Sequence, residues 1–128
     1  MRAKVNQDIC LNDYKNVWII AEQRDGKIAP VTIELIGEGR KLADILDREL
    51  MVAVCGYGMK EETENLLHYG VDKVCYLESP LLKDFSTDGY VKAFADLIRE
   101  RKPEIVLVGA TSLGRDIGPR LAARLGTG

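Results

Sequence analysis

The sequence predicts a three-layer α/β/α domain, in which helices cover both faces of an open, mostly parallel sheet. Segments with helical spacing alternate with four short runs that are apolar at consecutive positions, as in strands buried on both faces. Right-handed crossovers build such a β-α-β-α-β-α-β-α order into one sheet. The four expected strands are Val17–Ala21, Leu50–Cys55, Lys73–Leu77 and Ile105–Val108.

The first helix is expected over Thr32–Leu46, between strands one and two. Pro30 suits the entrance of this helix, where its missing N–H costs nothing. Gly37 and Gly39 weaken the middle of the helix by about 1 kcal/mol each. We therefore expect either close packing or a local break at these two glycines.

The second and third helices have clear end signals. Lys60–Tyr69 is followed by Gly70, a residue that often terminates helices, and Thr87–Arg101 ends just before Pro103. Between strand three and its helix, Glu78–Ser86 reads as a surface loop.

The last helix follows the glycine-rich stretch Gly109–Asp116 (GATSLGRD). Pro119 is costly inside a helix, by about 3 kcal/mol, but not in its first turn. We therefore expect this helix to begin near Arg115 or Asp116, with Asp116 as the N-cap. Asp116 and Arg120 can then pair across one turn.

The composition is that of one ordinary globular domain. The chain has 128 residues, 46% hydrophobic and 30% charged, with a formal net charge of −2. This charge gives no reason to expect a nucleic-acid partner. No run of about 18 apolar residues is present, so no membrane span is expected.

The N-terminus and the cysteines indicate a reducing cytoplasm. The first residues have neither the apolar core of a secretory signal nor the composition of a transit peptide. Cys10, Cys55 and Cys75 are odd in number and lack Cys-x-x-Cys spacing. Neither a disulfide framework nor a zinc site is expected.

A ligand crevice is expected at one edge of the sheet. Sheets of this class often have the doubly wound, Rossmann-like strand order 3-2-1-4, and ligands bind at the carboxyl ends where that order reverses. With that order, the loops after strands one and four flank the crevice: Glu22–Gly26 and Gly109–Asp116.

The second of these loops is not a phosphate loop. On the pattern G-x-x-x-x-G-K-[ST], Gly109 and Gly114 fit and Arg115 nearly fits, but Asp116 stands where a hydroxyl should reach Mg²⁺. The G-x-G-x-x-G fingerprint is also absent. NTP hydrolysis is therefore not expected.

Two interpretations of the loop remain open. In the structural one, Gly109 and Gly114 allow tight turning and Asp116 caps a helix. In the functional one, Thr111, Ser112 and Arg115 contact a ligand or partner in the crevice.

The remaining candidates give no catalytic set. Glu22 could receive a ribose hydroxyl, but we expect it to be a solvated loop residue. His68 is the only histidine, so no metal site and no Ser-His-Asp set can be argued. Trp18 is expected in the core. The sequence therefore shows no sign of an enzyme.

Two stretches closely resemble the alpha subunit of electron transfer flavoproteins. They are VWIIAEQRDGKIAPVTIELIGEGRKLAD (Val17–Asp44) and VLVGATSLGRDIGPRLAARLGTG (Val106–Gly128). The resemblance covers residues 13–128, after a leader of residues 1–12, and implies a fold similar to the adenine nucleotide alpha-hydrolases. DYKNVW (Asp13–Trp18) and LLKDFSTDGY (Leu81–Tyr90) further resemble alpha subunits of anaerobic bacteria. Those subunits pair with acyl-CoA dehydrogenases, and several bifurcate electrons from NADH.

The resemblance implies one part of a heterodimeric electron carrier. In that family a C-terminal domain of the alpha subunit carries FAD, and a beta subunit holds AMP or a second FAD. The N-terminal alpha domain packs on the beta subunit, so no cofactor is expected in this chain alone. Gly109, Thr111, Gly114, Arg115 and Asp116 match the family motif. They are expected to shape the subunit interface, or the crevice near the partner's cofactor.

The family chain continues past Leu-Gly-Thr-Gly into a further strand and the flavin domain. Without that strand, strand four is expected to be a sheet edge, through which the chain self-associates or depends on a partner. An alternative of another class stays open. It is a free-standing adenine-nucleotide-binding module, similar to universal stress proteins, that binds AMP or ATP on Gly109–Asp116.

Overall fold

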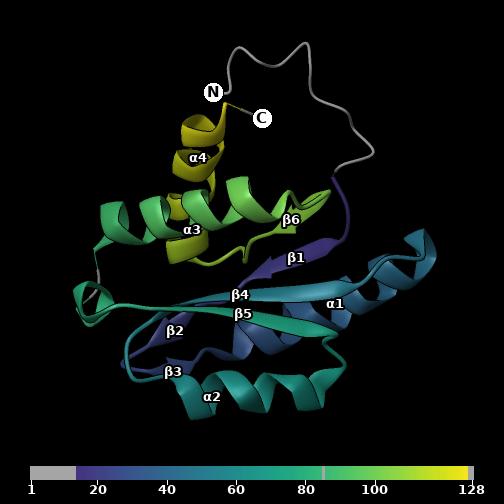
Figure 1. Cartoon of the computed structure of the whole chain (residues 1–128), viewed down its shortest axis with the longest axis horizontal. Coiled ribbons are helices and arrows are strands. Elements are labelled where there is room, and N and C mark those ends of the chain that lie inside the picture. Colours follow the sequence, from purple (N-terminus) through teal and green to yellow (C-terminus); the bar gives the residue numbers. More distant parts are fainter. Residues whose placement is uncertain (1–13, 85, 127–128) are drawn as a thin grey trace.

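The fold is a four-stranded parallel sheet covered by helices on both faces, as the computed structural model shows (Figure 1). The structure describes residues 14–84 and 86–126, so the expected leader of residues 1–12 lies outside the described residues. The strands of the main sheet are β1 (Val17–Ile20), β4 (Leu50–Gly56), β5 (Lys73–Glu78) and β6 (Ile105–Leu107).

The strand order is β5-β4-β1-β6, which is the predicted order 3-2-1-4. All three pairings are parallel; Val17 lies opposite Leu50 on one side and Ile105 on the other. The order reverses between β1 and β6, so the carboxyl ends of these two strands flank the switch point. In the described sheet β6 is an edge, as expected, and self-association through it stays a prediction.

The helices fall into two layers. In one layer are α1 (Pro30–Leu46), α2 (Lys60–Asn65) and the 3₁₀ turn η3 (Leu66–Tyr69), and in the other are α3 (Thr87–Arg101) and α4 (Ser112–Leu125). A second 3₁₀ turn, η4 (Pro80–Leu82), lies within the segment that was expected to be a plain surface loop.

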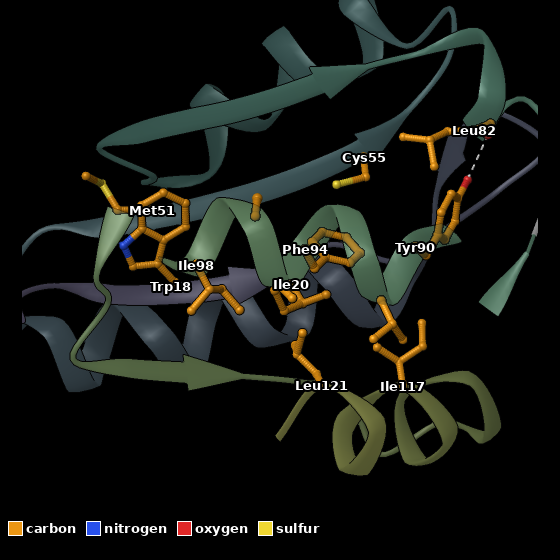
Figure 2. Close-up of a cluster of buried hydrophobic side chains, with 13 residues drawn as sticks. Trp18, Ile20, Met51, Cys55, Leu82, Tyr90, Phe94, Ile98, Ile117 and Leu121 are labelled. Atoms are coloured by element: carbon orange, nitrogen blue, oxygen red, sulfur yellow. Dashed lines mark hydrogen bonds between the residues drawn. The ribbon is translucent and has the colours of Figure 1, made fainter. Parts of the chain in front are cut away.

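Alternate residues of the central strands point to opposite layers. On β1, Val17 and Ile19 pack with α1, whereas Trp18 and Ile20 pack with α3 and α4. Figure 2 shows the second cluster, with Phe94 of α3 above Ile20. Trp18 is 2% exposed, which confirms its expected place in the core.

Helix α1 is continuous through its two glycines, and close packing explains one of them. A Cβ at Gly39 would lie 2.9 Å from the side chains of both Ile19 and Leu50. A Cβ at Gly37 would meet nothing within 4 Å. Gly39 therefore lets α1 approach the sheet, and the alternative of a local break is wrong.

Helix α4 corrects the sequence prediction. It begins at Ser112 and its N-cap is Thr111, so Asp116 is not the cap. Pro119 lies inside the helix rather than in its first turn. The residue before a proline is disfavoured in helical conformation because its backbone N–H and its Cβ clash with the proline ring. Gly118 has no Cβ, and this is one reason why the helix tolerates Pro119.

A small hairpin was missed. Strands β2 (Gln23–Arg24) and β3 (Lys27–Ile28) pair antiparallel, within a segment interpreted as a plain loop. Asp25 and Gly26 between them both have positive φ, 51° and 80°. Asp-Gly is the residue pair that such two-residue hairpin turns prefer, so the signal was present in the sequence.

Candidate functional site at the carboxyl edge of the sheet

Glu22 lies directly after β1, at the point where the strand order reverses. It is 7% exposed, so the expectation of a solvated loop residue is wrong. Its backbone N–H donates to the Thr32 hydroxyl at 2.9 Å, and that hydroxyl donates back to the Glu22 carbonyl at 3.1 Å. The Ala29 N–H also donates to the same carbonyl, at 2.9 Å. The first turn of α1 therefore fixes Glu22 against the sheet.

The Glu22 side chain crosses to the loop after β6. Its Oε1 accepts a hydrogen bond from the Thr111 hydroxyl at 2.7 Å. The same hydroxyl accepts from the Gly114 N–H at 2.9 Å, which is the N-cap bond of α4. Glu22, Thr111 and the N-terminus of α4 therefore form one chain of hydrogen bonds across the switch point.

Two glycines make room for the carboxylate. A Cβ at Gly109 would lie 2.5 Å from Glu22 Oε2. A Cβ at Gly114 would lie 3.2 Å from that same oxygen and would overlap the Gly109 carbonyl. The glycines predicted as turn residues are therefore needed for close packing, and neither has positive φ.

The other predicted site residues do not join this cluster. Ser112, Arg115 and Asp116 are exposed on the first turns of α4. Asp116 accepts from the Thr87 hydroxyl at 3.4 Å and pairs with Arg120 at 2.9 Å, so the predicted pairing of Asp116 with Arg120 is confirmed. Among the described residues, Ser112 and Arg115 make no side-chain hydrogen bond or ion pair.

The hairpin adds residues that the sequence analysis missed. The Gln23 side-chain amide donates to the Tyr90 hydroxyl at 2.5 Å. That hydroxyl donates to the Leu82 carbonyl at 3.1 Å, the bond drawn dashed in Figure 2. On the opposite side, the Ile28 N–H donates to Glu62 of α2 at 3.0 Å. These bonds hold the hairpin over the carboxyl edge of the sheet.

The described residues offer little reactive chemistry. Burial raises the pKa of the Cys55 thiol to about 12, so this cysteine is a core residue rather than a nucleophile. Burial also raises the pKa of Tyr90. No group of three or more His, Cys, Asp and Glu side chains that could hold a metal ion occurs in the part of the chain described. No helix described here is both long and apolar enough to cross a membrane.

A family model decides the assignment. The model of the electron transfer flavoprotein domain matches residues 17–128. The chain belongs to the electron transfer flavoprotein family. Its loop from Gly109 to Asp116 and its buried Glu22 both lie within the matched electron transfer flavoprotein domain.

Curated relatives agree with this assignment. The chain is 51% identical over 116 residues to the electron transfer flavoprotein subunit alpha of Clostridium acetobutylicum, which covers 91% of this chain and 34% of the relative. It is 46% identical over 118 residues to the acryloyl-CoA reductase electron transfer subunit beta of Anaerotignum propionicum, covering 92% of this chain and 32% of the relative. The chain thus spans about a third of the length of these relatives.

A solved structure supports the fold alone. The chain resembles a universal stress protein crystallised with cAMP, with a TM-score of 0.52 and 16% sequence identity, covering 89% of this chain and 93% of that one. This similarity places the domain of this electron transfer flavoprotein chain among the Rossmann-like folds, as predicted.

Proposed function

We propose that residues 13–128 form the N-terminal domain of the alpha subunit of a heterodimeric electron transfer flavoprotein. The observation that carries the proposal is the match to the family domain over residues 17–128, together with 51% identity to an alpha subunit. In this proposal the domain is a scaffold that docks on the beta subunit, and it has no catalytic role of its own.

Two places in the described part of the chain support a position for FAD outside it. At the switch point, where this fold class binds ligands, the Glu22 side chain fills the space between the two glycines. An open hollow of about 410 Å³ lies at the opposite, amino edge, lined largely by charged side chains such as Arg40, Asp44 and Asp72. An isoalloxazine ring needs an apolar slot, which these charges do not supply. The proposal therefore places FAD outside this chain, on the remainder of the alpha subunit, with AMP or FAD on the beta subunit.

The purified chain tests the cofactor part of this proposal. Its absorption spectrum after expression in a flavin-rich host should show no stoichiometric flavin. One tightly bound FAD per chain would overturn the proposal.

The exposed face of α4 is the proposed contact with the beta subunit. Ser112, Arg115 and Asp116 are exposed there, and Arg115 and Asp116 match the family motif. Arg115 has no ion-pair partner among the described residues. We expect Arg115→Glu to weaken binding to the beta subunit at least tenfold in a titration. Arg124→Glu is the matched control, because Arg124 is exposed on the same helix about two and a half turns further on. If both variants lost the same affinity for the beta subunit, Arg115 would not be an interface residue.

The proposed electron partners follow from the relatives. One relative is named as the electron transfer subunit of an acryloyl-CoA reductase, which suggests acyl-CoA chemistry for the full carrier of this chain. We propose an acyl-CoA dehydrogenase as redox partner, in the cytoplasm of an anaerobe, with electron bifurcation from NADH. Reduction of the assembled full-length heterodimer by NADH, with and without a low-potential acceptor, tests that step.

A second candidate is an adenine-nucleotide-binding module. It is favoured by the fold similarity to a universal stress protein solved with cAMP. Calorimetric titration of the isolated chain with AMP and ATP separates the two candidates. Micromolar binding that is lost in Arg115→Ala would favour the module, and absence of heat would favour the docking domain.

A further inference from the structure

The N-terminus of α4 is where this fold would admit an anion. Parallel α/β sheets bind ligands at the carboxyl ends of the strands flanking the switch point. Here the helix that starts at that point is α4, which has 14 residues and no acidic residue in its first turn. Unpaired N–H groups and the helix dipole favour negative charge at such a terminus.

A carboxylate of the chain itself already lies at this position. Glu22 comes from the loop after β1 and is 7% exposed. Its Oε1 is bonded to the hydroxyl of the N-cap residue Thr111 at 2.7 Å. Its Oε2 is buried and, among the described residues, has no hydrogen-bond partner. This oxygen is aimed at the gap between Gly109 and Gly114, the two glycines of the candidate loop.

We propose that Glu22 is a built-in anion, which occupies the ligand position at the N-terminus of α4 and closes it to phosphate-bearing molecules. Two features produce this closure. The Glu22 side chain fills the space between the two glycines. The Thr111 hydroxyl gives its one proton to Glu22 and accepts from Gly114, so it has no proton left for a ligand. The proposal does not depend on the subunit assignment.

If Glu22 closes this position, its substitution by a smaller residue should open the position to a small anion. Removing the carboxylate frees the Thr111 proton and leaves a small polar cavity next to the helix terminus. Such a cavity should accept a small anion, with acetate as the nearest mimic of the lost side chain and inorganic phosphate as the larger probe. Glu22→Gln keeps the shape of the side chain, so the gap should stay filled in that variant.

Amide spectra of the ¹⁵N-labelled chain test the proposal. We expect acetate and phosphate to leave the Gly114 and Thr111 amides of the wild-type chain unchanged, beyond what chloride of equal ionic strength does. In Glu22→Ala, acetate should shift both amides in a saturable way in the millimolar range. Glu22→Gln should behave as the wild type.

The titration of each of the three proteins can overturn the proposal. Saturable phosphate binding at Gly114 in the wild-type chain or in Glu22→Gln would show that the position is not closed by occupancy. A folded Glu22→Ala whose Gly114 amide ignores acetate would show that no anion position exists there. If Glu22→Ala is too unstable for spectra, acetate should raise its unfolding midpoint above that in equimolar chloride, because an occupant of the native state stabilises it. No such rise would contradict the proposal.

Discussion

The Glu22 carboxylate accepts a hydrogen bond from the Thr111 hydroxyl at 2.7 Å, although the two residues lie 89 positions apart in the sequence. The bond joins the end of β1 to the start of α4 across the point where the strand order reverses. Because the Thr111 hydroxyl also caps α4, the position of this helix depends on a buried carboxylate from the opposite end of the chain.

Thr111→Val should be unusually destabilising for the loss of a helix cap. A cap is worth about 1 kcal/mol, and a hydrogen bond to a buried charged group adds about 2 kcal/mol, so the free energy of unfolding should fall by about 3 kcal/mol. Urea unfolding monitored by circular dichroism measures this change in the free energy of unfolding. Ser86→Ala is the control, because Ser86 caps α3 through the Gly89 N–H without a carboxylate behind it. Equal losses in the two variants would mean that the bond to Glu22 adds nothing.

Gly114→Ala should destabilise the fold by about 3 kcal/mol or more, because the new methyl group would overlap the Gly109 backbone carbonyl. Gly37→Ala is the matched helical control. No atom lies within 4 Å of its added Cβ, so better helix propensity should stabilise the chain by about 0.5–1 kcal/mol. Thermal unfolding of the two variants should therefore shift in opposite directions. A Gly114→Ala variant as stable as the wild type would contradict the packing described here.

Asp72 should make the fold acid-sensitive. The Leu50 N–H donates to it at 2.7 Å and the Arg40 guanidinium at 3.0 Å, and both lower the pKa of this carboxyl below its ordinary range. The native state therefore binds the proton less readily than the unfolded state. This contribution to stability is complete above about pH 4 and is lost as the pH falls through the lowered pKa.

Asp72→Asn should flatten the decline of stability below about pH 4. Asp96→Asn is the comparison, because the pKa of Asp96 is also lowered, but chiefly by Lys92 one turn earlier on the same exposed helix face. Urea unfolding between pH 2 and pH 7 measures both, with the larger change expected for Asp72→Asn. If the free energy of unfolding of Asp72→Asn fell below about pH 4 as it does in the wild type, Asp72 would not be a source of the acid sensitivity.

The strand order and the two layers could be predicted from the sequence. Consecutive apolar positions in Val17–Ile20 and Leu50–Gly56 reflect strands buried on both faces, and this requirement acts on each residue locally. The helices between the strands have end signals that also act locally, such as Gly70 with its φ of 88°. The fold class therefore follows from short stretches of chain, whereas the strand order 3-2-1-4 was taken from the order that doubly wound sheets often have.

The site could not be predicted in the same way. The burial of Glu22 depends on Thr111, and no local pattern around either residue reports the other. The cap of α4 was misassigned because Pro119 was expected to lie in a first turn, whereas the helix accommodates it further in, beside Gly118. Single-residue preferences allow Thr as well as Asp at an N-cap, so they do not distinguish Thr111 from Asp116.

Binding of the beta subunit tests the central claim most directly. The claim is that this chain is a docking domain of an electron transfer flavoprotein alpha subunit. Analytical ultracentrifugation of the chain mixed with its cognate beta subunit should show a one-to-one complex, and Arg115→Glu should weaken it while Arg124→Glu should not. No complex at micromolar concentrations, together with tight binding of AMP or ATP by the isolated chain, would contradict the account.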